Sequence, residues 1–286
     1  MYSLLLVIIY IAFISLGLPD SLLGSAWPAM HQQLGVPLSY AGIVTMIIAG
    51  GTIISSLMSD RLTRRLGAGL VTAISVMLTA VALFGFSISG SLVYLCLWAI
   101  PYGLGAGAVD AALNNYVALH YASRHMSWLH CFWGVGAAAS PFIMSYCLVN
   151  GWGWNGGYRS VAGIQIVLTL ILFVSLPLWK RKSISSNSSE TLPANLSLLQ
   201  ALKIRGVKFV LFTFFGYCAL ETTTGLWASS YLVRYRGIDT ETAARFASLF
   251  YLGITFGRFL CGFIAEKVGD KLLIRFGIIT IMIGII

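Results

Sequence analysis

The sequence predicts an all-α polytopic membrane protein, and three of its features indicate this class. Hydrophobic residues make up 58% of the 286 residues and charged residues only 9%, and the mean hydropathy is +0.87. Soluble domains carry about 25% charged residues, so this chain is expected to lie in lipid. Nearly every window of about 20 residues is apolar enough to span the roughly 30 Å of hydrocarbon in a bilayer.

Glycine, proline, serine and charged clusters divide the chain into apolar segments of helical length. We expect transmembrane helices at 4–29, 39–59, 68–88, 91–118, 127–149, 160–179, 207–233 and 241–264, and a ninth helix that begins near 271. The first segment lacks the basic residues that open a secretory signal, and its apolar stretch continues to Trp27. It is therefore expected to be a retained helix.

A strongly hydrophilic stretch at 180–206 separates two groups of helices. It begins Lys180-Arg181-Lys182 and continues through a serine- and asparagine-rich run that is too polar to pack. We expect a flexible cytoplasmic linker there. It would join an N-terminal six-helix bundle at 1–179 to an incomplete C-terminal bundle at 207–286.

The basic residues indicate how the chain crosses the membrane. With the N-terminus in the cytoplasm, thirteen Lys and Arg residues fall on cytoplasmic segments and four (Arg159, Arg234, Arg236 and Arg245) on outer ones. This bias predicts a multi-pass protein of the plasma (inner) membrane with a cytoplasmic N-terminus. The net charge of +9 is spread over short turns rather than one face, so nucleic acid is not an expected partner.

The five cysteines lie scattered in apolar segments without a CxxC pair. They predict neither a disulfide framework nor a metal site, and the sequence suggests no cofactor.

Two features recur at similar offsets along the chain. Asp60 and Glu266, each followed by cations, lie 206 residues apart, and Asp20 and Glu221, acids inside apolar segments, lie 201 residues apart. A common offset suggests a duplicated unit of about 200 residues, as in transporters built from structural repeats. Since the second copy stops at Ile286, we expect the sequence to be C-terminally truncated.

The charged clusters at the helix ends predict a cytoplasmic gating loop. A carboxylate followed by cations can form an ion pair between neighbouring helices that breaks and re-forms as two bundles rock. The residues assigned to this role are Asp60, Arg61, Arg64, Arg65, Glu266 and Lys267, with Arg258 grouped among them. The alternative is that these charges only set topology.

The loop Ser59-Asp60-Arg61-Leu-Thr-Arg64-Arg65-Leu-Gly67, its second copy and the basic linker after six helices resemble the major facilitator superfamily. The usual loop pattern is roughly Gly-x-x-x-Asp-Arg-x-Gly-Arg-Arg, and this chain departs from it with serine near the first glycine and Thr63 near the middle one. The resemblance implies twelve helices in two bundles around a central cavity, of which about nine are present here.

Three carboxylates, Asp20, Asp110 and Glu221, fall well inside membrane segments. Each costs about 2.5–3.5 kcal/mol at a helix centre, so three without a role would be unusual. Burial disfavours the charged form of a carboxyl group, which makes such groups natural proton carriers. The sequence therefore predicts proton coupling at these residues, with structural hydrogen bonding as the alternative.

The segments expected at 4–29, 91–118 and 127–149 resemble the fucose–proton symporter branch of that superfamily. Pro19 should bend the first helix beside Asp20, and Asp110 and Asn114 share a helix face at i,i+4. The resemblance implies proton coupling and sugar binding at Asp20, Asp110 and Asn114. It also implies solute contact at His130 in His130-Cys-Phe132-Trp133-Gly134, although a histidine packed in the core is the alternative.

The helix expected at 207–233 carries polar and aromatic residues at roughly helical spacing. Tyr217, Glu221, Thr224 and Trp227 follow one broad face. Groups that bind hydroxyls beside rings that stack on a sugar suit a saccharide pocket. The alternative for the aromatic residues is packing or an interfacial belt.

These features predict a secondary active transporter for proton-coupled uptake of a monosaccharide or similar small neutral solute. Gly136-Ala-Ala-Ala-Ser140-Pro141 partly resembles the signature of antiporters, which leaves drug or metabolite efflux as an alternative. A solute sensor or a non-functional fragment is also open. An enzyme is not expected, since HExxH and GxSxG motifs are absent. The solute, sodium in place of protons, and the oligomeric state stay open.

Overall fold

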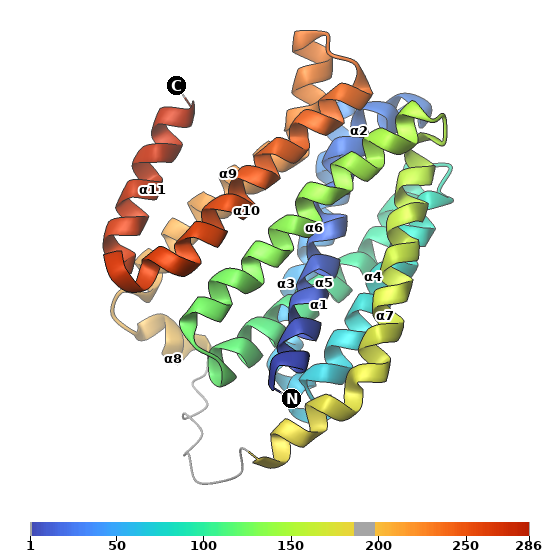
Figure 1. Ribbon diagram of the computed structural model, residues 1–286. Coiled ribbons are helices and arrows are strands. Elements are labelled where there is room, and N and C mark those ends of the chain that lie inside the picture. Colours follow the sequence, from blue (N-terminus) through green and yellow to red (C-terminus); the bar gives the residue numbers. More distant parts are fainter. Residues whose placement is uncertain (1, 186–197, 286) are drawn as a thin grey trace.

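The computed structural model describes residues 2–185 and 198–285, and all its regular elements are helical (Figure 1). In chain order they are α1 (Tyr2–Asp20), α2 (Leu22–Gln33), a short 3₁₀ helix (Leu38–Tyr40), α3 (Ala41–Leu66), α4 (Ala68–Ser87), α5 (Leu92–His120), α6 (Ser123–Val149), α7 (Gly153–Ser185), α8 (Leu198–Lys203), α9 (Val207–Arg236), α10 (Thr240–Val268) and α11 (Asp270–Ile285). Within the described residues, eight helical segments are long and apolar enough to cross a membrane. The predicted fold class is confirmed, and the predicted ninth helix corresponds to α11.

The first membrane segment is broken beside its acidic residue. Pro19 lies in the last turn of α1, which ends at Asp20, and α2 begins at Leu22. Proline has no N–H to donate and its ring crowds the preceding turn, so it disrupts the helix where the sequence predicts a bend. The break places Asp20 at the end of a helix rather than within a continuous one.

The helix predicted at 160–179 extends further in both directions. Gly151 and Gly153 adopt positive φ angles of 73° and 63°, and α7 begins at once after this turn. Trp154 in its first turn is buried and donates a hydrogen bond to Gln33 Oε1 at 2.6 Å. At the other end, helical turns occupy 180–185 and 198–203 of the predicted linker, and 186–197 lie outside the described residues.

Two equivalent turns support the predicted repeat but correct its register. Gly67 ends α3 with φ 81° and ψ 152°, and Gly269 ends α10 with φ 84° and ψ 144°. This conformation favours glycine because a Cβ atom would be strained there. These caps lie 202 residues apart, close to the spacing of Asp20 and Glu221. Asp60 lies two turns before its cap and Glu266 in the last turn, so the two acids do not occupy equivalent positions relative to these caps.

Helices from the two halves of the sequence pack on one another. α6 and α10 run side by side along much of their length (Figure 1). Their backbones approach closely at Gly134, where an added Cβ would lie 3.2 Å from Thr255 Cα. α2 packs against α9 in the same way, since a Cβ on Gly24 would lie 3.0 Å from Leu226 Cα. These contacts fix the helices that surround the site described below.

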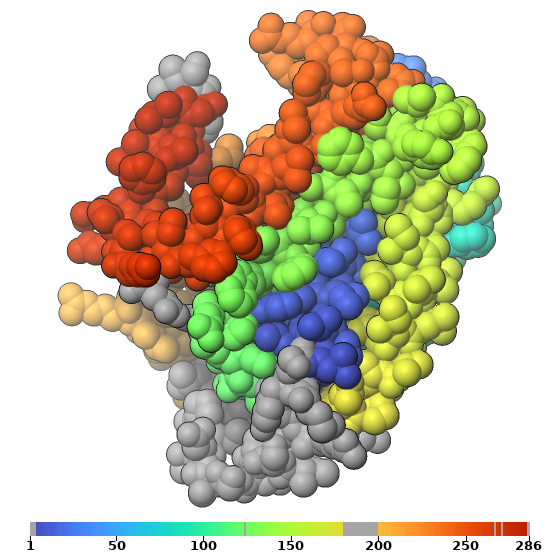
Figure 2. All heavy atoms as spheres, in the orientation of Figure 1, coloured from blue at the N-terminus to red at the C-terminus, as the bar shows by residue number. Residues whose placement is uncertain are grey.

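The outer faces of α9, α10 and α11 are rich in exposed apolar side chains. Phe212, Phe256 and Phe276 are 77%, 63% and 72% exposed. The space-filling view shows α10 running diagonally beside α6, with a notch between α11 and the lobe formed by the end of α9 and the start of α10 (Figure 2). Apolar faces of this extent are unfavourable in water and fit a bilayer environment.

Candidate functional site

A cavity of about 1010 Å³ lies between helices of both halves of the sequence. Its walls come from the break between α1 and α2 and from α3, α4, α5, α6, α7, α9 and α10. The lining reaches Ser127 and Phe214, near the ends of α6 and α9 that lie on the same side as the N-terminus (Figure 1). On the other side the contact of Gly24 with Gly225 brings α2 against α9. The lining also reaches Phe86 and Tyr158, near the opposite ends of α4 and α7, where both side chains are only 2% exposed and the cavity is therefore covered.

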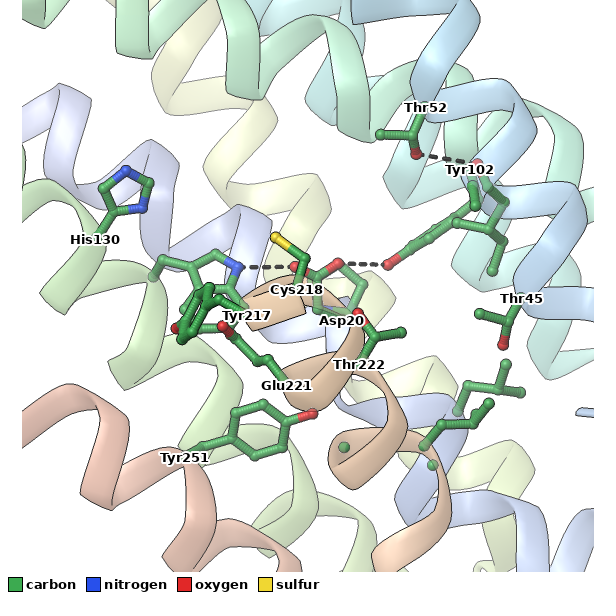
Figure 3. A pocket seen from close by; sticks show the side chains of 18 of the residues that line it. Asp20, Thr45, Thr52, Tyr102, His130, Tyr217, Cys218, Glu221, Thr222 and Tyr251 are labelled. Atoms are coloured by element: carbon green, nitrogen blue, oxygen red, sulfur yellow. Dashed lines mark hydrogen bonds between the residues drawn. The ribbon is translucent and has the colours of Figure 1, made fainter. Parts of the chain in front are cut away.

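Asp20 lies near the middle of this cavity, with Tyr102 on one side and Tyr217 and Glu221 on the other (Figure 3). Its Oδ1 accepts a hydrogen bond from the Tyr102 hydroxyl at 2.9 Å, and its Oδ2 accepts one from Trp133 Nε1 at 2.8 Å. Its side chain is exposed to the cavity. The helix break thus presents a carboxylate that is held by two neutral donors.

Arg258 of α10 and Glu221 of α9 form an ion pair across the cavity from Asp20. The guanidinium Nη2 lies 3.5 Å from Glu221 Oε2. It also donates to the Tyr217 hydroxyl at 2.9 Å, and Nη1 donates to the His130 carbonyl oxygen at 3.4 Å. The guanidinium carbon lies 4.7 Å from the centre of the Trp133 ring, a cation–π distance. The cavity therefore contains one cation and two carboxylates from different helices.

All the residues of this site lie in the part of the chain that matches a protein-family profile. A profile described as Major Facilitator Superfamily matches residues 9–286. The chain belongs to the Major Facilitator Superfamily. Its helical fold and its cavity between two groups of helices agree with the architecture that the resemblance implied.

Relatives within the superfamily are distant. The chain is 24% identical over 283 residues to Bypass of stop codon protein 6 of Saccharomyces cerevisiae, which covers 90% of this chain and 56% of that protein. It is 24% identical over 206 residues to the glucose/mannose transporter GlcP of Bacillus subtilis, which covers 69% and 50%. It is 21% identical over 285 residues to the cis,cis-muconate transport protein of Acinetobacter baylyi, which covers 94% and 68%. The chain thus spans about half the length of the first two.

Aromatic side chains complete the wall of this superfamily member's cavity, and sequence reasoning missed several of them. Tyr102, Trp133, Tyr158 and Tyr251 line it together with Tyr217. An aromatic residue on an apolar helix is usually part of the core, so nothing in the pattern separated these from their neighbours. For Trp133, its position three residues after His130 in the helix predicted at 127–149 could have identified it as a residue of the site.

The structure corrects the assignment of Arg258 to the cytoplasmic gating loop. This residue lies inside α10, ten positions before Val268 ends the helix, and its guanidinium faces the cavity. A lone cation within an apolar segment is as costly in a membrane as a lone carboxylate. The reasoning that selected Asp20 and Glu221 would have selected Arg258 as well.

The structure also shows which face of the helix predicted at 207–233, now α9, lines the cavity. Tyr217 and Glu221 line the cavity, together with Cys218, Thr222 and Gly225, whereas Thr224 and Trp227 are not among the lining residues. Since residues at i, i+4 and i+8 share one face, Gly225 lies over Glu221, and the Trp227 side chain packs against the apolar core instead. In this conformation Thr224 and Trp227 lie off the cavity lining, and their contact with solute stays a prediction.

Asp110 and Asn114 form a local pair on α5 outside the cavity lining. Asn114 Nδ2 donates to Asp110 Oδ1 at 2.9 Å and to its backbone oxygen at 3.0 Å. The i,i+4 arrangement is as predicted, and the proton-coupling and sugar-binding roles of this pair stay predictions.

His130 lies at the cavity wall, as expected of a solute-contacting residue. Its imidazole ring packs edge-on against the Phe13 ring, with the two ring centres 5.5 Å apart. The side chain therefore combines a packed edge with access to the cavity, and both readings of this residue have a structural basis.

The charged cluster at the end of α3 contains an ion pair within that helix. Asp60 Oδ2 lies 2.7 Å from Arg64 Nη2, one turn away on the same helix, and both side chains are more than half exposed. Such pairs contribute about 0.3–0.5 kcal/mol. Arg61, Arg65 and Lys267 are exposed at helix ends. The side chain of Glu266 lies outside the described residues, so the second half of the predicted latch has no structural description.

Among the described residues, no group of three or more His, Cys, Asp or Glu side chains is arranged to hold a metal ion. The lining of the cavity offers carboxylates, a guanidinium, hydroxyl groups, aromatic rings, the His130 imidazole and the thiols of Cys218 and Cys261.

Proposed function

We propose that this protein is a secondary active transporter that takes up a monosaccharide or similar small neutral solute together with protons by alternating access. One observation carries the proposal. A single cavity contains an acid from α1 and an acid–base pair from α9 and α10, so that both halves of the sequence contribute ionisable groups to one site.

Proton coupling is assigned to Asp20 first. Its hydrogen-bond partners are the neutral groups of Tyr102 and Trp133, which bind a carboxylate without compensating its charge. Protonation neutralises such a group, so a proton can accompany the solute across the membrane. Glu221 already has Arg258 as a partner, and Asp110 stands outside the lining. These two acids are proposed as later stages of the proton route.

A neutral solute suits the charges of the cavity. With Asp20 and Glu221 ionised and Arg258 protonated, the three charged lining residues sum to one negative charge. An anionic solute would be repelled by this charge and would meet a guanidinium that is already occupied. The hydroxyl groups of Tyr102, Tyr217 and Tyr251 can bind sugar hydroxyls, and aromatic rings can stack on the apolar face of a sugar.

Alternating access is supported by the way the cavity is covered. α2 meets α9 on one side, while the lining extends toward the other side, where the N-terminus lies. We propose that this conformation opens to the cytoplasm, with the N-terminus inside and the protein in the plasma membrane, since the basic residues cluster at that end. Transport would exchange this covering contact for one on the cytoplasmic side.

The test is uptake by the full-length protein in proteoliposomes. With an acidic exterior, labelled glucose should accumulate, a protonophore should abolish accumulation, and replacing sodium by choline should have no effect. Glucuronate, which differs from glucose by one carboxylate, should compete at least about tenfold less well. Accumulation that requires sodium, or export of glucose under the same gradient, would contradict the proposal.

The efflux alternative rests on Gly136 to Pro141, and packing accounts for that segment. A Cβ on Gly136 would meet the Ile14 carbonyl oxygen of α1, and Ser140 Oγ donates a hydrogen bond to the Leu18 carbonyl oxygen. The small residues are therefore needed for α6 to lie against α1. We do not propose efflux as a second function.

A further inference from the structure

Among the described residues, Trp133 is the side chain that joins Asp20 to Arg258, through a hydrogen bond to the first and a cation–π contact with the second. Its indole N–H donates to Asp20 Oδ2 at 2.8 Å, and its ring lies 4.7 Å from the Arg258 guanidinium carbon. Asp20 belongs to α1 and Arg258 to α10. A single aromatic residue on α6 therefore joins ionisable groups from the two halves of the sequence.

The backbone of Trp133 is held on both sides. A Cβ on Gly17 of α1 would meet the Trp133 carbonyl oxygen, and a Cβ on the next residue, Gly134, would meet Thr255 of α10. Since α6 is clamped between these helices at this level, the indole can respond to its partners mainly by turning about its side-chain bonds. The hydrogen bond to Asp20 and an edge-on contact with the Tyr251 ring, at a centroid distance of 6.2 Å, restrict that rotation.

The Arg258–Glu221 pair is loose enough to respond. Its closest N–O distance is 3.5 Å, whereas charge-assisted hydrogen bonds are usually about 2.7–2.9 Å long. Arg258 instead makes its short contact, 2.9 Å, with the Tyr217 hydroxyl. The guanidinium thus contacts the Trp133 ring and the Tyr217 hydroxyl, while its distance to the Glu221 carboxylate exceeds that of a charge-assisted bond.

We infer that Trp133 is a positioning residue that transmits the charge state of Asp20 to Arg258. While Asp20 is ionised, its charge-assisted bond fixes the indole and the ring face holds the guanidinium. A proton bound at Asp20 converts this to a neutral hydrogen bond of roughly half the strength. The indole is then released, and Arg258 can close on Glu221 or on a bound solute. The inference rests on the proposed function for its physiological meaning.

Several other groups that titrate or carry charge surround Asp20 and must be separated from it in a test. They are Tyr102 and Asp110 on α5, His130 on α6, Tyr158 on α7, Tyr217, Cys218 and Glu221 on α9, and Tyr251 and Arg258 on α10. Of these, the carboxylates and the histidine are the ones whose ordinary range approaches neutral pH. Single variants at these positions can identify which group a pH transition belongs to.

A solute-free measurement tests the inference directly. In the full-length protein labelled with 5-fluorotryptophan, the ¹⁹F resonance absent from Trp133→Phe reports this indole. It should shift with pH in one transition that is lost in Asp20→Asn but kept in Asp110→Asn, Glu221→Gln and His130→Gln. In Arg258→Lys the resonance should move at every pH while the transition remains. A resonance insensitive to pH, or a transition that survives in Asp20→Asn, would overturn the inference.

A second measurement connects the inference to transport. The apparent affinity of the wild type for glucose should change at least about fivefold between pH 5.5 and 7.5, and the change should fall below about twofold in Trp133→Phe, which keeps a ring under Arg258 but removes the N–H. Tyr102→Phe, which removes the other donor to Asp20, should move the midpoint and keep the amplitude. Parallel loss of affinity at both pH values in Trp133→Phe would mean that the indole is merely structural. If glucose does not bind while the ¹⁹F transition is present, the proposed function fails and the positioning role stands.

Discussion

Replacing Glu221 with Gln removes the carboxylate that neutralises Arg258 and should change which solutes the cavity admits. At 3.5 Å, an effective dielectric constant of about 20 gives a gross attraction of about 5 kcal/mol. The two side chains are 24% and 15% exposed, and desolvation offsets much of that attraction. We therefore expect a net effect of about 1–3 kcal/mol. The cavity charge changes from one negative charge to none, and Arg258 becomes available to a solute carboxylate.

The assay is competition between glucose and glucuronate for uptake or binding. Relative to wild type, Glu221→Gln should shift the ratio of apparent affinities toward glucuronate by about 5–150-fold, which corresponds to 1–3 kcal/mol. Glu241→Gln is the matched control, because it removes a carboxylate from the first turn of α10, outside the cavity lining. An unchanged ratio in Glu221→Gln, or an equal shift in both variants, would refute the electrostatic reasoning.

Two further predictions concern the conformation of the helices. Gly24→Ala should disfavour the contact of α2 with α9, since a Cβ there would meet the Gly225 carbonyl oxygen. Overpacking of about 1–3 kcal/mol should raise labelling of the cavity about 5–150-fold, when an impermeant thiol reagent is added on the side that this contact covers. Gly42→Ala, with nothing within 4 Å of the added Cβ, should not change labelling, and equal effects of both would count against this contact as a gate. At the start of α10, the Thr242 backbone N–H donates to Asp239 Oδ1 at 2.7 Å and lowers the pKa of that carboxyl. A lowered folded-state pKa means that the ionised carboxyl stabilises the helix end above the unfolded pKa of about 3.9, and that this stabilisation is lost as pH falls through the folded-state pKa. Hydrogen exchange at the Thr242 amide should therefore become faster at low pH than it does in Asp239→Asn. Identical pH profiles in the two proteins would argue against the cap.

The positions of the membrane helices could be predicted because they depend on local composition. Apolar runs of about 20 residues must satisfy their backbone hydrogen bonds internally in lipid, so they form helices wherever they occur. Glycine turns such as Gly67 and the proline beside Asp20 mark ends and breaks for reasons that also lie within a few residues. The start of α7 was misjudged because its glycine-rich first turn resembles a loop, and burial of Trp154 decides the matter.

The candidate site was only partly predictable because side-chain orientation depends on packing between distant helices. Asp20 and Glu221 stood out as carboxylates in apolar segments. Which residues of α9 face the cavity depends on its contact with α2 at Gly225, and sequence spacing alone could not distinguish Thr222 from Thr224. The joining of Trp133 to Arg258 depends on the packing of α6 against α10, which no local pattern encodes.

The most direct measurement compares two modes of transport in Asp20→Asn. In proteoliposomes, this variant should lose accumulation of glucose driven by a pH gradient, because the residue that carries the proton cannot titrate. Exchange of internal for external glucose without a gradient should persist within about tenfold of wild type, since one of the two hydrogen bonds to Asp20 can still form. Accumulation that continues in Asp20→Asn would contradict the assignment of Asp20 as the coupling residue, and so would equal loss of both modes.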